Sequence, residues 1–124
     1  MGSVDKNSIL VVDDQAGIRI LLEELFTDEG YEVKLAGNGN EALAKISEDN
    51  PDLILMDMKM PGMDGIETLR KLKQCGQGDR VIFMTAYGET ELVNQARENG
   101  AFAYITKPFN ILDLCRLVDD HLQN

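Results

Sequence analysis

Five short apolar runs alternate with segments of helical periodicity along this chain of 124 residues. We interpret the runs as strands over residues 8–12, 31–35, 52–57, 80–85 and 102–106. All but the second are continuously apolar, which indicates strands of a parallel sheet that are buried on both faces. The second run alternates between apolar and polar residues and therefore predicts an edge strand. This alternation of strand and helix restricts the chain to an α/β fold.

The segments between the runs carry the signals of helices. Apolar residues recur at helical spacing in the first segment, at positions 18, 21, 22, 25 and 26. Glycines and capping patterns predict where the helices begin and end. The first helix ends at Gly30, the second begins at Asn38 with Glu41, and the third begins at Asp64 with Glu67. The fourth spans about 89–99 and ends at Gly100, and the fifth begins near Asn110.

Repeated strand–helix units with right-handed crossovers form a doubly wound parallel sheet. Five such units permit the flavodoxin-like (βα)5 fold with strand order 2-1-3-4-5. This order places the first and third strands side by side at the point where the winding reverses. Ligands of such sheets bind beyond the carboxyl ends of the strands, so the residues that follow the apolar runs are the candidate site.

Polar residues stand where four of the runs end: Asp13, Asp14, Asp57, Thr85 and Lys107. Adjacent carboxylates repel each other, and Mg²⁺, which prefers oxygen ligands, relieves that repulsion. An Asp pair alone would more simply cap the first helix, but Asp57 at a neighbouring strand end favours the metal site. An aspartate can also act as a nucleophile toward phosphorus. Lys107 and Thr85 would supply the charge and hydrogen bonds that phosphoryl transfer requires.

Composition excludes several other classes of function. The formal net charge is −10 and the pI is about 4.4, which argues against a nucleic-acid partner. No apolar run reaches the roughly 20 residues that span a bilayer, so no membrane partner is expected. The N-terminus lacks an apolar signal core, and Cys75 and Cys115 have no metal-type spacing, so we expect a cytoplasmic protein. Residues 1–7 are expected to be a flexible N-terminus that begins with a cloning remnant, and residues 8–124 a single domain.

Four motifs at the strand ends cover residues 11–14, 55–65, 84–86 and 106–109. Together they resemble the receiver domain of two-component response regulators, and the similarity extends from about Ser8 to Leu122. The resemblance implies that a histidine-containing donor phosphorylates Asp57. It implies that Mg²⁺, for which Mn²⁺ or Ca²⁺ can substitute, is held by Asp13, Asp14, Asp57 and the backbone carbonyl of Lys59.

The same resemblance assigns the remaining site residues. Lys107 is expected to pair with the phosphoryl group, and Thr85 and Tyr104 to form the switch that responds to it. The Lys107–Pro108 peptide bond is expected to be cis, against a base rate of about 5–6% for bonds that precede proline. Partners are expected to dock on an apolar patch formed by Gln15, Ile18, Leu22, Pro108 and Phe109. Leu21 and Leu25 are expected to face inward.

Residues 13–22 and 84–89 further resemble single-domain receivers of sporulation-type phosphorelays. Such a receiver takes its phosphoryl group from a sensor histidine kinase and passes it to a histidine phosphotransferase; a monomer is expected. Ala16 replaces an aromatic residue of that group, and Tyr104 replaces a histidine. Residues 100–107 also resemble receivers of enhancer-binding transcription activators, so an excised activator domain and a chemotaxis-type receiver stay open as alternatives.

An enzyme of the haloacid-dehalogenase type is the competing interpretation, because those phosphohydrolases also use an aspartate nucleophile. They need a second carboxylic acid two residues after the nucleophile. Lys59 occupies that position here and cannot serve as the acid or base. We therefore expect a relay that uses its own aspartate, without multiple-turnover hydrolysis.

Overall fold

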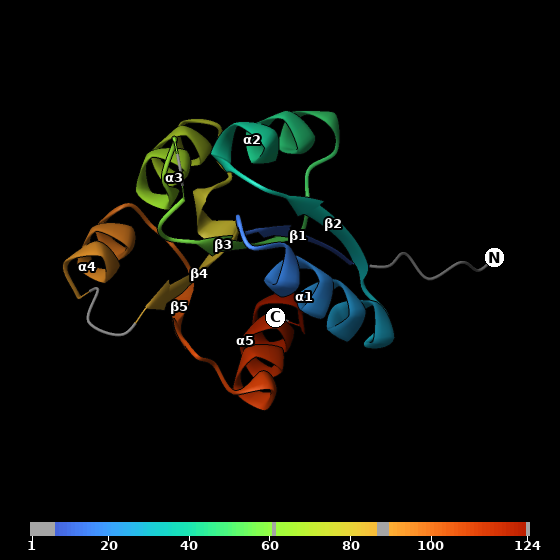
Figure 1. Ribbon diagram of the computed structural model, residues 1–124. Helices are drawn as coiled ribbons and strands as arrows, with labels where there is room; N and C mark the ends of the chain where they lie inside the picture. The colour runs from blue at the N-terminus through green and yellow to red at the C-terminus, as the bar shows by residue number, and fades with distance from the viewer. Residues whose placement is uncertain (1–6, 61, 87–89, 124) are drawn as a thin grey trace.

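Five parallel strands form one sheet in the order β2-β1-β3-β4-β5 in this computed structural model (Figure 1). The structure describes residues 7–60, 62–86 and 90–123. The predicted strand order and flavodoxin-like fold are confirmed. The strands are β1 (Ser8–Val12), β2 (Glu32–Ala36), β3 (Leu53–Asp57), β4 (Val81–Ala86) and β5 (Ala103–Lys107). Each lies within one or two residues of its predicted range.

Helices cover both faces of the sheet, as Figure 1 shows. They are α1 (Ala16–Asp28), α2 (Gly39–Glu48), α3 (Gly65–Gln74), α4 (Thr90–Glu98) and α5 (Ile111–Gln123), with a short 3₁₀ helix, η1 (Gly78–Arg80). The α1 and α5 helices pack on one face, and α2, α3 and α4 pack on the other. Among the described residues, no helix combines the length and apolar character that crossing a bilayer requires.

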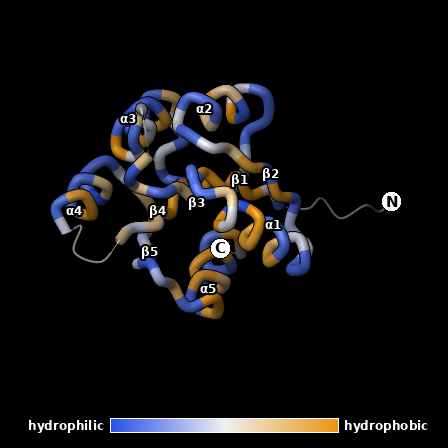
Figure 2. The backbone as a smooth tube through the Cα atoms, viewed as in Figure 1, coloured by the Kyte–Doolittle hydropathy of each residue, from blue (hydrophilic) through white to orange (hydrophobic). Residues whose placement is uncertain are grey.

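Two buried clusters form the core, one on each side of the sheet. Successive residues of β1 point to opposite faces, so Ile9 and Val11 join the α1–α5 cluster while Leu10 and Val12 join the cluster under α2, α3 and α4. Figure 2 shows the resulting concentration of apolar residues along β1. This burial on both faces confirms the interpretation of the continuous apolar runs in the central strands.

The two predicted capping patterns are present. Asn38 Oδ1 accepts a hydrogen bond of 2.8 Å from the backbone N–H of Glu41, and Asp64 Oδ1 accepts one of 2.9 Å from the N–H of Glu67. These bonds satisfy amide groups that have no partner within the helix, and they fix where α2 and α3 begin. Position 89, the expected start of the fourth helix, lies outside the described residues, as do Pro61 and residues 1–6.

The expectation that the fifth strand is buried on both faces is wrong. The β5 strand is the second edge of the sheet, and burial alternates along it. Phe102, which precedes it, and Tyr104 are both exposed despite lying in an apolar run. A run of apolar residues reports residue type, whereas exposure depends on which strands and helices lie beside it. Ala103 and Ile105 pack against the cluster under α1 and α5, whereas Tyr104 and Thr106 point to the opposite face and are exposed.

Candidate functional site

The register of the sheet brings the carboxyl ends of four strands together. Val12 pairs with Met56, Asp57 with Met84, and Ala86 with Lys107. Asp13 and Asp14 follow β1 directly, beside Asp57 at the end of β3. One carboxylate oxygen from each of these three aspartates lies within 4.8 Å of the others. The structure therefore assembles the acidic cluster at the edge of the sheet where the sequence predicts it.

Asp13 is held in place by bonds from three directions. Its carboxylate accepts a 2.8 Å hydrogen bond from the backbone N–H of Gln15 and a 2.9 Å bond from the ammonium of Lys107. Its own N–H donates to the carbonyl of Ala36 at 3.1 Å. Asp13 has an exposed fraction of 0%, and these partners compensate the cost of burying its charge. Asp13 is thus a fixed anchor, while Asp14 beside it is exposed.

Lys107 lies between two of the carboxylates. Its Nζ atom is 2.9 Å from Asp13 Oδ2 and 3.5 Å from Asp57 Oδ1. Burial lowers the pKa of Lys107, but the hydrogen bond and charge of Asp13 and the charge of Asp57 outweigh burial, so its pKa stands above the ordinary value. Lys107 is therefore a permanent cation at neutral pH, placed next to the Asp57 carboxylate.

The environment of Asp57 raises the affinity of its carboxylate for a proton. Burial raises its pKa from 3.8 to about 6, the charges of Asp13 and Asp14 add to the rise, and Lys107 opposes it. Its side chain is 14% exposed, so part of the carboxylate remains accessible. Asp57 is ionised at neutral pH, and the net negative charge around it makes a further cation favourable.

The cluster fits a small divalent cation. It offers hard oxygen donors only, and its three carboxylates carry more charge than the Lys107 ammonium offsets. Because both oxygens of Asp13 already accept hydrogen bonds from the protein, Asp14 and Asp57 are the better direct ligands. Mg²⁺ commonly uses one or two carboxylates and keeps several water ligands, which matches this arrangement.

Comparison with known proteins assigns the family. The family model of the response regulator receiver domain matches residues 9–119 of this chain. The chain belongs to this receiver family. It is 49% identical over 114 residues to sporulation initiation phosphotransferase F of Bacillus subtilis (strain 168), covering 92% of each protein. It is 41% identical to the regulatory protein AtoC of Escherichia coli (strain K12), where 94% of this chain matches only 25% of AtoC.

Solved structures agree with the family assignment. A response regulator receiver domain protein from Clostridium thermocellum has a crystal structure that superposes on this receiver with a TM-score of 0.88. The two are 31% identical, and the match covers 94% of each chain. The fold and the family are therefore established together.

The predicted switch residues occupy the strands beside Asp57. Thr85 is buried near the end of β4, one position after the residue that pairs with Asp57. Tyr104 is exposed on β5, and the guanidinium of Arg97 lies 5.1 Å from the centre of its ring. The predicted cis bond between Lys107 and Pro108 is confirmed. The switch role of both residues stays a prediction.

The loop after Asp57 is tied to the end of the sheet. The N–H of Met58 donates to the carbonyl of Met84 at 3.1 Å, and the N–H of Gly65 donates to the carbonyl of Met58 at 2.9 Å. A Cβ atom on Gly65 would lie 2.9 Å from the Asp57 carbonyl oxygen, so only glycine fits. The sequence marked Gly65 only as part of a motif. Lys59, whose carbonyl is the predicted fourth ligand, lies within this loop.

The predicted orientation of two α1 leucines is wrong. Leu22 was expected near the exposed edge and Leu21 inward, but Leu22 has an exposed fraction of 0% and Leu21 one of 42%. Leu22 and Phe26, one helical turn apart, define the buried stripe of α1. Gln15 and Pro108 are exposed as expected, and Ile18 and Phe109 are half-buried. Leu21 therefore replaces Leu22 in the predicted docking patch.

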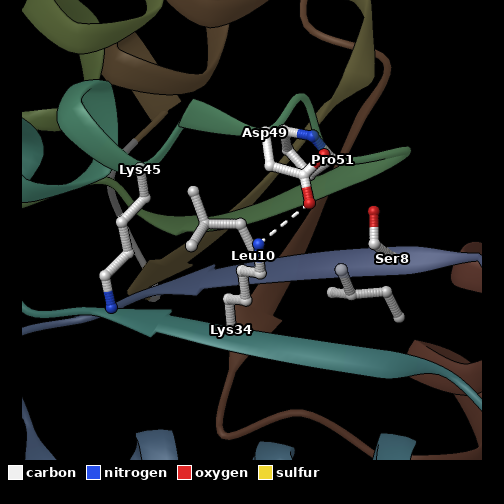
Figure 3. A pocket seen from close by; sticks show the side chains of 7 residues that line it. Ser8, Leu10, Lys34, Lys45, Asp49 and Pro51 are labelled. Carbon is white, nitrogen blue, oxygen red and sulfur yellow. Dashed lines mark hydrogen bonds and ion pairs between the residues drawn. The ribbon is translucent and has the colours of Figure 1, made fainter. Parts of the chain in front are cut away.

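A pocket elsewhere on the receiver offers no comparable chemistry. It lies between α2 and the β1–β2 pair and is shown in Figure 3. Lys34 and Asp49 form an ion pair of 2.9 Å there, and Lys45 donates to the backbone carbonyl of Leu35. The charged groups of this pocket thus bond to one another or to the backbone, and the strand-end cluster remains the candidate site.

Proposed function

We propose that this receiver accepts a phosphoryl group on Asp57 from a phosphohistidine of a sensor kinase and passes it to a histidine phosphotransferase. The observation that carries the proposal is the contact of Lys107 with both Asp57 and the buried Asp13. That contact places a nucleophilic carboxylate next to a fixed positive charge. The sequence identity of 49% to sporulation initiation phosphotransferase F, over 92% of both proteins, supports a relay role.

The residues of this chain have distinct tasks in the transfer. A carboxylate oxygen of Asp57 forms a bond to phosphorus while the phosphorus–nitrogen bond of the donor breaks, and the imidazole leaves with the electron pair. Lys107 offsets the charge on the phosphoryl oxygens, and its bond to Asp13 keeps it from moving away. Thr85, next along β4, is the hydroxyl closest in register to bond a phosphoryl oxygen.

Asp14, Asp57 and the carbonyl of Lys59 would hold Mg²⁺, with Asp13 beside them. The ion would supply positive charge to the phosphoryl oxygens when bound, as divalent cations do in phosphoryl transfer. Mn²⁺ or Ca²⁺, which take similar oxygen ligands, are expected to substitute. The need for an added cation follows from the charge of the cluster, in which carboxylates outnumber the ammonium.

Partners are proposed to dock where α1 and the loop after β5 meet. Leu21 is exposed on α1, Ile18 is half-buried beside it, and Pro108 and Phe109 follow Lys107 directly. Such an apolar patch, which continues from Lys107 and thus from the contact with Asp57, suits a helical partner that presents a histidine. We propose that the receiver does this as a monomer in the cytoplasm, with proteins as its partners and without nucleic acid or membrane.

A second candidate rests on the match to AtoC. Because this receiver corresponds to only a quarter of that regulatory protein, its phosphorylation could control an attached output domain instead. The two candidates share the chemistry at Asp57 and differ in the next step. Only the relay requires that phosphate leave Asp57 for a histidine on another protein.

The experiment is phosphotransfer from a panel of purified histidine kinases, followed by addition of histidine phosphotransferases. Wild type is expected to take label from at least one kinase and to return it to a phosphotransferase. Asp57→Asn should take no label from a kinase or from a small acyl phosphate, and labelling of that variant would refute the site. Label that reaches Asp57 but no phosphotransferase would favour the second candidate. Sustained hydrolysis of para-nitrophenyl phosphate would instead favour a phosphohydrolase.

A further inference from the structure

Arg19 reaches from α1 back to the acidic cluster, a contact that no motif of the sequence indicates. Its Nη1 atom donates a 2.7 Å hydrogen bond to the backbone carbonyl of Asp13. The backbone N–H of Arg19 donates to the carbonyl of Gln15 at 3.2 Å. Arg19 therefore donates two hydrogen bonds to the segment that joins β1 to α1. A Cβ on Gly37 would lie 3.6 Å from Nη1, which places the guanidinium over the turn between β2 and α2.

The carbonyl that Arg19 holds belongs to the peptide unit that joins Asp13 to Asp14. A peptide unit is planar, so fixing its oxygen also fixes the direction in which the chain leaves toward Asp14. Asp13 is immobilised independently through its side chain and its N–H. Asp14 is exposed, and Arg19 is the charged side chain that bonds the peptide unit leading to it.

We infer that Arg19 is a positioning residue, which aims the Asp14 carboxylate toward Asp57 and thereby strengthens the binding of a divalent cation between them. The inference rests on the proposed function, in which Asp14 and Asp57 hold Mg²⁺. Groups that orient a metal ligand typically change metal affinity 10- to 100-fold when they are removed. Arg19 would act through the backbone of the ligand and would not touch the ion.

The sign of the effect separates positioning from simple electrostatics. A guanidinium near the cluster repels a cation, so loss of its charge alone would tighten Mg²⁺ binding. Loss of the hydrogen bond would loosen it, because Asp14 would no longer be held toward Asp57. If Arg19 acts by position, an uncharged replacement without a donor must weaken the affinity in spite of the relieved repulsion.

Arg80 provides a matched control. Its Nη1 atom donates a 2.8 Å bond to the backbone carbonyl of Pro51, the same kind of contact at nearly the same distance. Pro51 and Arg80 precede β3 and β4, so this bond lies at the opposite end of the strands from the aspartates. Removing either arginine costs one bond from a charged donor, but only Arg19 is joined to the cluster.

The experiment measures Mg²⁺ affinity by calorimetry or amide NMR titration at constant ionic strength, with the labelling rate from acetyl phosphate as a second readout. Wild type, Arg19→Met, Arg19→Lys and Arg80→Met are compared. Arg19→Met is expected to bind Mg²⁺ about tenfold more weakly and to label more slowly. Arg19→Lys should retain most of the affinity, because an ammonium can donate to the same carbonyl. Arg80→Met should lose comparable unfolding free energy with unchanged Mg²⁺ affinity.

Equal or tighter Mg²⁺ binding by Arg19→Met would overturn the inference. So would an equal weakening in Arg80→Met, which would indicate general loosening of the fold. If Arg19→Met does not fold, Arg19→Leu, which also lacks both the charge and a hydrogen-bond donor, is judged by the same criterion. A wild-type chain that neither binds Mg²⁺ nor labels would contradict the proposed function and this inference with it. Normal wild-type behaviour with an unaffected Arg19→Met contradicts the inference alone.

Discussion

Asp13 and Asp14 are adjacent in the sequence but have opposite environments, because β1 ends just before them and the chain turns toward α1. Asp13 is fully buried, and its two carboxylate oxygens accept bonds from Gln15 and Lys107. Asp14 is exposed. A buried charge whose partner is removed costs far more than an exposed one, so the two residues should respond very differently to substitution.

Asp13→Ala is expected to destabilise the fold by about 1–3 kcal/mol, because it removes the acceptor of the Gln15 N–H and the closer of the two carboxylates that contact Lys107. Asp14→Ala should change the unfolding free energy of the metal-free protein by less than about 0.5 kcal/mol, as exposed positions usually do. It should nevertheless remove the stabilisation that added Mg²⁺ gives. Urea unfolding with and without Mg²⁺ measures both quantities, and equal losses for the two variants would contradict this division.

Asp57 makes stability depend on pH in a predictable direction. Its pKa is raised from 3.8 to about 6 in the folded chain, mainly by burial. A carboxyl group whose pKa is higher in the folded than in the unfolded state favours folding while it is protonated. This contribution to the unfolding free energy is lost as the pH rises from the unfolded-state pKa through the folded-state pKa. Asp57 therefore destabilises the metal-free fold at neutral pH.

Asp57→Asn removes this ionisation and should be more stable than wild type by roughly 1–3 kcal/mol at pH 7.5 in the presence of a chelator. The difference should shrink as pH falls from about 6 to about 4, where wild-type Asp57 becomes protonated. The measurement is urea unfolding of wild type and Asp57→Asn at pH 7.5 and at about pH 4. A difference that is independent of pH would show that the environment of Asp57 does not disfavour its charge.

At the scale of the element, α1 shows what a sequence pattern resolves and what it does not. The pattern at positions 18, 21, 22, 25 and 26 correctly predicted a helix that ends before Gly30. It did not decide which leucines face the sheet, since five apolar positions cover a wider arc than one contact stripe. Packing against α5 and the sheet selects Leu22 and Phe26, and leaves Leu21 exposed.

Substitution of Leu21 and of Leu22 should therefore have different effects on stability and on partner binding. Leu22→Ala should cost about 2–5 kcal/mol of unfolding free energy, because it opens a cavity in the core. Leu21→Ala should cost less than about 1 kcal/mol, and should slow phosphotransfer between proteins while leaving labelling by acetyl phosphate unchanged. Urea unfolding and the two labelling assays decide the matter. Equal loss in both assays for Leu21→Ala would remove Leu21 from the docking patch.

For the molecule as a whole, the sequence predicted the fold because strand and helix signals alternate and only a few topologies accommodate them. It predicted that the aspartates and Lys107 lie close together, because residues that follow parallel strands share one end of the sheet. It could not predict the bond from Arg19 to the Asp13 carbonyl, since backbone acceptors have no sequence signal. Nor could it show the exposure of β5, which depends on position in the assembled sheet.

Cation binding should stabilise the entire fold, because the cluster joins the ends of β1 and β3 only in the folded state. A ligand at 100 times its dissociation constant adds about 2.7 kcal/mol to the unfolding free energy. Thermal unfolding in Mg²⁺, Mn²⁺ or Ca²⁺ should therefore shift upward more than in NaCl of equal ionic strength. Screening of the net charge of −10 would affect both solutions alike. Equal shifts in Mg²⁺ and NaCl would argue against a specific site.

The ion pair between Asp13 and Lys107 joins positions 94 residues apart. For protein engineering, this separation makes the receiver a candidate for fragment complementation. A chain divided in the turn between α3 and β4 yields one piece with all three aspartates and another with the lysine. Neither piece alone contains a complete site. Phosphorylation of the first piece would then report that the second has rejoined it, with no fluorescent or enzymatic reporter attached.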